Sequence, residues 1–252
     1  MLSVNVNKVA TLRNTREIDI PSVIRAARIC LEAGAAGITV HPRPDQRHIR
    51  RNDVSEVAAV VADFPGREYN IEGNPFHGLM EFAERIHPTQ CTLVPDDPDA
   101  VTSNHGWDLA HDGQRLRPII ARLHDLGCRV SLFMDAASDG IAMAAEIGAD
   151  RIELYTEPYA AAFARGRWRE SLSLFADAAR RAADAGLGVN AGHDLNLGNL
   201  PPLVAALPNL QEVSIGHALI ADALEFGLAE TVRRYLEATR RENSTMRATN
   251  EE

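Results

Sequence analysis

Strand-like and helix-like segments alternate eight times along this chain of 252 residues, and this alternation limits the fold more than any other feature. Short apolar runs predict strands at residues 2–7, 37–41, 68–72, 91–95, 129–135, 151–155, 187–191 and 212–216. The segments between them carry apolar residues three and four positions apart, as amphipathic helices do. Eight such units in about 250 residues fit a closed parallel (β/α)8 barrel of the TIM type better than an open sheet.

Three helical segments stand out, at residues 21–35, 112–127 and 171–188, and Pro21 is expected in the first turn of the first one. An extra short helix is expected at 158–166. With 45% hydrophobic but only 5% aromatic residues, the chain suits one large aliphatic core. We therefore expect a single barrel domain over residues 1–242, followed by a polar, disordered tail at 243–252.

Composition also limits the setting of the protein. The apolar runs are short and interrupted by charges, which predicts a cytoplasmic protein without membrane contact. Cys30, Cys91 and Cys128 are far apart, and their spacing fits neither a disulfide framework nor a zinc site. A formal charge of −9 argues against a general affinity for nucleic acid.

Polar residues follow nearly every predicted strand. In a parallel barrel the loops after the strands form one face, so these side chains should converge there. The residues concerned are Asn5, Asn7, Lys8, His41, Arg43, Glu72, Thr102, Asp135, Glu153, His193, Gly216 and His217. Any one of them could instead cap a turn or face water. It is their expected convergence that predicts an active site.

Two strands end in a glycine followed by a histidine, Gly192-His193 and Gly216-His217. Glycine permits close backbone approach, free N–H groups at a helix start bind phosphate, and histidine transfers protons near neutral pH. His41 and Glu72 end two other strands and are candidates for proton abstraction beside a carbonyl. The alternatives are hydrogen-bonded structural histidines and a salt bridge from Glu72 to Arg43 or Arg47.

Basic residues cluster in the segment 41–51, where Arg43, Arg47 and His48 could clamp a phosphate or carboxylate. Arg50 and Arg51 are expected to be solvated, and Arg13 and Arg16 are expected in a smaller basic loop. Lys8 is the only lysine of the chain. We expect it to pair with phosphate or to be exposed, with imine chemistry as the alternative.

Seven segments together resemble the pyridoxine 5'-phosphate synthase family of vitamin B6 biosynthesis: SVNVNKVATLRNTR, GITVHPRPDQRHI, YNIEGNP, TLVPD, RVSLFMDA, VNAGHDLNLGNL and SIGHALI. The resemblance implies a barrel with extra helices, a homo-octamer built as a tetramer of dimers, and no metal or organic cofactor. It also implies condensation of 1-deoxy-D-xylulose 5-phosphate with 3-amino-2-oxopropyl phosphate to pyridoxine 5'-phosphate, phosphate and water.

The resemblance implies that His41 and Glu72 are proton acceptors and that His193 is a proton donor. It further implies that the amino ketone phosphate contacts Asn5, Arg16, Asp194, Gly216 and His217. For the deoxyxylulose phosphate, the implied contacts are Asn7, Lys8, Arg43, His48 and Thr102.

The chain departs from the family pattern at several positions. Asn7-Lys8 replaces a common Asp-His pair, while Asp194 and Glu157 stand where glycine is frequent.

Three other functions remain open. They are a metal-dependent hydrolase using His41, His193, His217 and Asp135; a lysine-imine aldolase centred on Lys8; and a phosphate-binding protein that has lost catalysis through the Asn7-Lys8 change.

Overall fold

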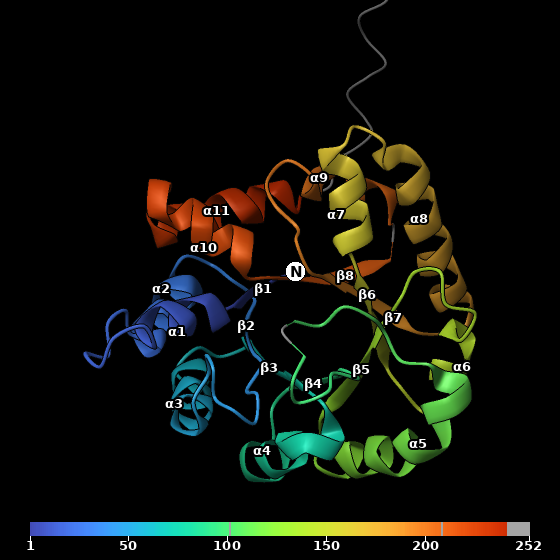
Figure 1. The fold of residues 1–252 in the computed structure, drawn as a ribbon, viewed down its shortest axis with the longest axis horizontal. Helices are drawn as coiled ribbons and strands as arrows, with labels where there is room; N and C mark the ends of the chain where they lie inside the picture. Colours follow the sequence, from blue (N-terminus) through green and yellow to red (C-terminus); the bar gives the residue numbers. More distant parts are fainter. Residues whose placement is uncertain (101, 208, 241–252) are drawn as a thin grey trace, which may run out of the picture.

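The computed structural model describes residues 1–100, 102–207 and 209–240, and within them eight parallel strands close into a barrel (Figure 1). The strands are β1 (Leu2–Asn5), β2 (Gly37–Val40), β3 (Glu68–Gly73), β4 (Gln90–Leu93), β5 (Arg129–Met134), β6 (Arg151–Tyr155), β7 (Gly188–Gly192) and β8 (Leu210–Ile215). Each strand pairs with the next, and β8 returns to β1 through pairs such as Val4 with Ile215. The predicted (β/α)8 barrel is confirmed.

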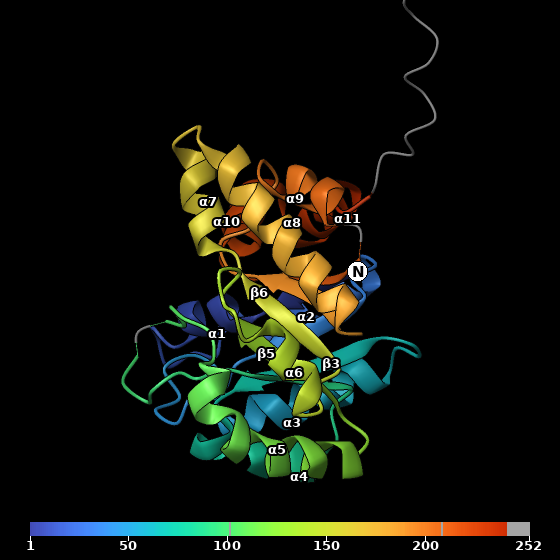
Figure 2. The ribbon, with the colours of Figure 1, turned by 90° about the vertical axis from the view of Figure 1, so that its right-hand side faces the viewer.

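Helices surround the barrel (Figure 1). They are α1 (Asn7–Arg13), α2 (Val23–Glu32), α3 (Arg51–Ala62), α4 (Met80–Ile86), α5 (Leu109–Asp125), α6 (Ile141–Glu146), α7 (Glu157–Ala164), α8 (Trp168–Asp184), α9 (Leu200–Ala206), α10 (His217–Phe226) and α11 (Leu228–Ala238), with a π-helical turn η1 (Pro75–Leu79) before α4. Helix α7 is the expected extra helix after the sixth strand. It packs against α8, and α10 packs against α11 (Figures 1 and 2).

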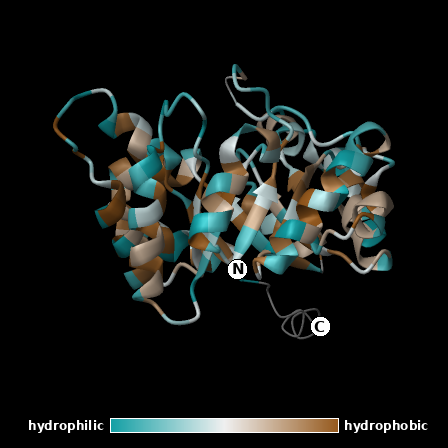
Figure 3. Ribbon diagram, turned by 90° about the horizontal axis from the view of Figure 1, so that it is seen from below, coloured by the Kyte–Doolittle hydropathy of each residue, from teal (hydrophilic) through white to brown (hydrophobic). Residues whose placement is uncertain are grey.

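Two kinds of interior follow from the alternation of side chains along each strand. Outward-facing residues such as Val4, Ile71 and Leu132 belong to an aliphatic core shared with the helices. That sharing explains the mixture of hydrophobic and hydrophilic residues along the helices in Figure 3. Inside the barrel, polar residues such as Asn70 and Thr92 are fully or almost fully buried and hydrogen-bonded to each other. The barrel therefore carries a polar centre below its carboxyl-terminal mouth.

Two local expectations were wrong. Pro21 lies outside α2, because Ser22 caps the helix by accepting a hydrogen bond from the backbone N–H of Arg25. Arg13 lies in helix α1 rather than in a basic loop, and its guanidinium forms a buried ion pair with Asp53 at 2.6 Å. The expected disordered tail, residues 243–252, lies outside the described residues. Among the described residues, no helix is long and apolar enough to cross a membrane.

Candidate active site

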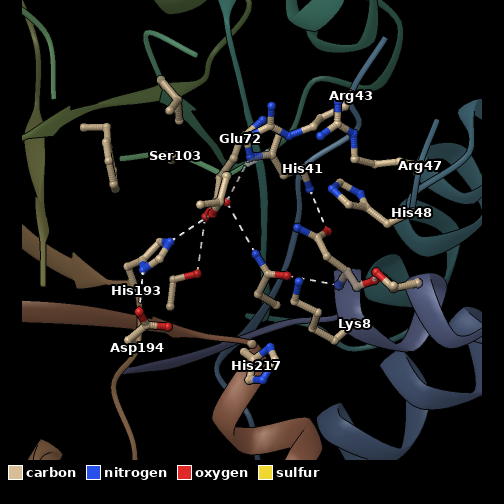
Figure 4. A pocket seen from close by; sticks show the side chains of 18 of the residues that line it. Lys8, His41, Arg43, Arg47, His48, Glu72, Ser103, His193, Asp194 and His217 are labelled. Atoms are coloured by element: carbon tan, nitrogen blue, oxygen red, sulfur yellow. Dashed lines mark hydrogen bonds and ion pairs between the residues drawn. The ribbon is translucent and has the colours of Figure 1, made fainter. Parts of the chain in front are cut away.

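A cavity of about 550 Å³ opens at the carboxyl ends of the strands, and most of the candidate residues line it (Figure 4). The candidate residues in its wall are Asn5, Asn7, Lys8, His41, Arg43, Arg47, His48, Glu72, Thr102, Glu153, His193, Asp194, Gly216 and His217. The parallel barrel brings them together from seven strands and their following loops. The residues that follow the strands thus form one site.

Two candidates lie elsewhere. Arg16 is an exposed residue beyond the end of α1 and is not part of the cavity wall. Asp135 accepts a hydrogen bond from the backbone N–H of Gly106 at 3.0 Å, so its carboxylate fixes a loop. The histidines at residues 77, 87, 105, 111 and 124 are exposed and are not part of the cavity wall. In the described parts of the chain, no group of three or more His, Cys, Asp or Glu side chains is placed to hold a metal ion.

Glu72 lies near the carboxyl end of β3, and its side chain lines the cavity (Figure 4). Its Oε1 accepts a hydrogen bond from Oγ of Ser214 at 3.3 Å, and its Oε2 accepts one from Nδ2 of Asn5 at 3.4 Å. Burial raises the pKa of the Glu72 carboxyl to about 8, and the negative charges of Glu212 and Asp96 act in the same direction. A carboxyl with such a pKa can both accept and donate a proton near neutral pH.

His41 follows β2 and faces Glu72, with 3.8 Å between Nδ1 of the ring and Oε2 of the carboxyl. Its backbone N–H donates to Oδ1 of Asn7 at 3.0 Å, and Oδ1 of Asn5 accepts from the backbone N–H of Asn7. Burial lowers the pKa of His41 well below its usual value, and Arg43 is the next largest cause. The imidazole is therefore uncharged at neutral pH, despite its carboxyl neighbour, and its free ring nitrogen can accept a proton.

His193 approaches the same cavity from β7 with an unusual backbone. Its φ is +89°, and that of Asp194 is +59°, a region in which glycine is favoured. Nε2 of His193 lies 3.1 Å from Oγ1 of Thr102, and Nδ1 lies 3.1 Å from Oδ2 of Asp194. The interaction with His193 is the largest cause lowering the pKa of the Asp194 carboxyl. Asp194 is thus a neighbouring negative charge for the imidazole.

The two glycines beside the histidines have clear steric roles. A Cβ on Gly192 would collide with Oε1 of Glu153, and a Cβ on Gly216 would come within 3.2 Å of Cβ of Asn5. Gly216 also precedes α10, whose first turn leaves backbone N–H groups facing the cavity mouth near His217. These groups suit a phosphate.

The arginines of the segment 41–51 form two groups, as expected. Arg43 and Arg47 line the cavity, whereas Arg50 and Arg51 form exposed ion pairs with Asp19 and Glu81. His48 also lines the cavity, and burial, with Arg43 as the next cause, lowers the pKa of its ring to about 4. Lys8 is exposed at the mouth of the cavity. The cavity thus combines basic groups at its rim with a buried carboxyl below.

Sequence reasoning missed several residues of the site. Ser103 and Ser214 line the cavity, and Asp96 pairs with Arg43, but serine and aspartate near strand ends are too common to be singled out. Glu153, by contrast, was among the polar residues expected to converge, and it does line the cavity. Burial raises its pKa well above the usual value, with Glu72 as the next cause.

Comparison with known proteins points to the same family as the resemblance of the sequence segments. A family model described as pyridoxal phosphate biosynthesis protein PdxJ matches residues 2–241. Pyridoxine 5'-phosphate synthase of Albidiferax ferrireducens is 56% identical over 240 residues, covering 93% of this chain and 95% of that protein. The protein of the same name from Xanthomonas campestris pv. campestris is 57% identical over 242 residues, covering 93% and 94%.

Solved structures with little sequence similarity share the fold. Tryptophan synthase from M. tuberculosis, in its aminoacrylate-bound form, matches with a TM-score of 0.64 and 12% identity, covering 95% of this chain and 92% of that one. Thiamine phosphate pyrophosphorylase from Pyrococcus furiosus matches with a TM-score of 0.58 and 10% identity, covering 94% of each chain. At such low identity these matches show the barrel alone. The family match over residues 2–241 and the close relatives establish that the chain belongs to the PdxJ family of pyridoxal phosphate biosynthesis proteins.

Proposed function

We propose that this protein is a pyridoxine 5'-phosphate synthase, which condenses 1-deoxy-D-xylulose 5-phosphate with 3-amino-2-oxopropyl phosphate and releases phosphate and water. One observation carries the proposal beyond family membership. His41, Glu72 and His193, which come from three different strands, line one cavity of about 550 Å³. A cavity of this size suits small phosphorylated molecules.

The reaction consists of proton transfers and eliminations. Imine formation, enolisation and dehydration each need a base and an acid in contact with the substrate. Neutral His41 and the Glu72 carboxylate would accept protons, and His193 would donate them to departing oxygen. The pKa of about 8 for Glu72 lets one carboxyl take part in successive transfers. No step changes the oxidation balance between protein and substrate, so we expect no nicotinamide, and the family resemblance implies neither a metal nor an organic cofactor.

The two phosphates would bind at opposite sides of the cavity. Gly216, His217 and the first turn of α10 provide N–H donors for the amino ketone phosphate, with Asn5 and the backbone of Asp194 beside them. Arg43, His48, Lys8, Asn7 and Thr102 surround the space proposed for the deoxyxylulose phosphate. Arg16 would reach the first phosphate only after moving, since it lies outside the cavity wall.

The resemblance further leads us to propose a cytoplasmic homo-octamer, a tetramer of dimers. Sedimentation of the purified protein tests this assembly. A mass that corresponds to eight chains would support it, and a monomer at micromolar concentration would contradict it.

The function is tested by mixing both phosphorylated substrates with purified protein and following pyridoxine 5'-phosphate by its fluorescence. We expect product only when both substrates are present. Calorimetric titration with each substrate distinguishes the synthase from the main alternative, a protein that binds the substrates without catalysis. Binding of both substrates without product would favour that alternative, because Asn7-Lys8 departs from the family pattern at this site.

A further inference from the structure

Asp96 follows β4 and forms the centre of a buried polar cluster next to the cavity. Nη2 of Arg43 lies 2.5 Å from its Oδ2, and Oγ of Ser103 donates to the same oxygen at 2.6 Å. Asp96 is 5% exposed and Arg43 is 6% exposed, so water screens this pair little. The carboxylate therefore ties the loop after β2 to both ends of the segment 96–103.

Arg43 is held in place by two separate acceptors. Besides its bond to Asp96, its Nη1 donates to the carbonyl oxygen of Ala100 at 2.7 Å. Arg47 donates to the same carbonyl at 2.9 Å. Arg43 also lines the cavity (Figure 4), so these bonds fix the position of its guanidinium at the cavity wall.

Ser103 links Asp96 to the acid–base residues. It is adjacent in sequence to Thr102, whose Oγ1 lies 3.1 Å from Nε2 of His193. The hydrogen bond from Ser103 to Asp96 thus fixes the segment that places Thr102 beside the imidazole. One carboxylate supports groups on both sides of the cavity.

Stability alone explains Asp96 poorly. Its Oδ1 is buried and has no hydrogen-bond partner in the described part of the structure. An unsatisfied buried acceptor is destabilising, because it has lost its hydrogen bonds to water. Buried ion pairs also gain little over apolar packing, because both charges lose their hydration. A carboxylate retained under these conditions is typical of a functional site.

We propose that Asp96 is a positioning residue: its carboxylate directs Arg43 toward a bound phosphate ester and holds Thr102 beside His193. This inference rests on the proposed synthase function and adds a residue to it. Asp96 does not line the cavity itself, so it acts through Arg43 and Ser103.

The charge of Asp96 also acts on Glu72. The groups around Glu72 are His41 from β2, Asn5 from β1, Glu153 from β6, and Ser214 and Glu212 from β8. Glu212 and Asp96 are the two charges that raise the pKa of Glu72. Removal of the Asp96 charge would also leave Arg43 without its counterion. Both changes favour the ionised form of Glu72. In a plot of kcat/KM against pH, the acid limb, where activity rises with pH, should therefore move to lower pH.

The test compares Asp96→Asn with the matched control Asp99→Asn, which makes the same change at an exposed residue of the same loop. Losing a charge-assisted contact of this kind costs about 1.5–3 kcal/mol, so we expect KM for the deoxyxylulose phosphate to rise ~10- to 100-fold in Asp96→Asn. KM for the amino ketone phosphate should change less than about threefold, because its proposed site lies across the cavity. The acid limb should shift to lower pH, and Asp99→Asn should match the wild type.

Ser103→Ala keeps the ion pair and removes one hydrogen bond, so it remains informative if Asp96→Asn folds poorly. It should raise the same KM by a smaller factor. Equal changes in both KM values, or an unmoved pH limb in folded Asp96→Asn, would overturn the proposal.

A crystal structure of Asp96→Asn tests the inference without turnover and so separates it from the proposed function. Displacement of Arg43 from the Ala100 carbonyl supports the positioning role. An unchanged position of Arg43 in this variant would overturn the positioning role, whatever reaction the wild type performs.

Discussion

Nδ1 of His41 and Oε2 of Glu72 lie 3.8 Å apart in the cavity, yet at neutral pH His41 is uncharged and Glu72 is mostly protonated. Burial raises the pKa of Glu72 to about 8, and burial together with Arg43 lowers the pKa of His41 well below its usual value. The barrel thus brings a base and a proton-holding carboxyl together without an ion pair. This arrangement suits a reaction in which protons move repeatedly over a short distance.

The first prediction concerns pH. If Glu72 acts as a base, it must be ionised, and its pKa of about 8 leaves most molecules protonated at neutral pH. The value of kcat/KM should therefore rise with pH and reach half its limiting value near pH 8. The pH–rate profile of the purified enzyme checks this. A flat profile from pH 6 to about 9 would show that ionisation of Glu72 does not limit catalysis.

Ser214 provides a second prediction. Its Oγ donates to Oε1 of Glu72 at 3.3 Å, and this bond lowers the pKa of the carboxyl. Ser214→Ala should therefore raise that pKa and move the acid limb to higher pH by up to about one unit. Ser131→Ala is the control, since Ser131 is a buried strand serine whose Oγ has no hydrogen-bond partner among the described residues. Identical profiles for the two variants would contradict the role of Ser214.

Two ion pairs of equal length predict unequal effects on stability. Arg13 and Asp53 are 2.6 Å apart and buried, whereas Arg28 and Asp63 are 2.6 Å apart and about half exposed. Arg13→Met should lower the free energy of unfolding by about 3–5 kcal/mol, because Asp53 remains buried without its partner. Arg28→Met should cost less than about 1 kcal/mol. Urea denaturation measures both, and similar losses would contradict the role assigned to burial.

Lys8 allows a clean test of the aldolase alternative, because it is the only lysine of the chain. Its place at the exposed mouth of the cavity suits phosphate pairing more than a Schiff base. Borohydride added with 1-deoxy-D-xylulose 5-phosphate should leave the protein mass unchanged, and Lys8→Arg should retain turnover within about tenfold. A substrate adduct on Lys8, together with an inactive Lys8→Arg, would establish the lysine-imine alternative.

The sequence predicted the barrel and most of the cavity wall for one physical reason. In a closed parallel barrel, the end of a strand determines where its last side chain lies, so His41, Glu72 and His193 could be placed from local patterns. Contacts between distant segments could not be predicted in this way. Arg13 is buried because Asp53, 40 residues away, reaches it, and Asp96 matters because Arg43 lies beside it.

The roles of Gly192 and Gly216 also depend on contacts between distant segments. The Gly-His pairs predicted close approach of a ligand to the backbone, but the closest atoms to a Cβ at Gly192 and Gly216 belong to Glu153 and Asn5. Both glycines make room for side chains of the site. Only the folded barrel shows this, because the partners come from other strands.

The central claim is that the buried carboxyl of Glu72 performs acid–base catalysis in the condensation. Turnover of Glu72→Gln, measured with both phosphorylated substrates, tests it most directly, since glutamine keeps the size of the side chain and one acceptor oxygen but cannot exchange a proton. We expect kcat to fall by ~10²- to 10⁴-fold while the variant remains folded. A folded Glu72→Gln variant with kcat within about threefold of the wild type would contradict the account.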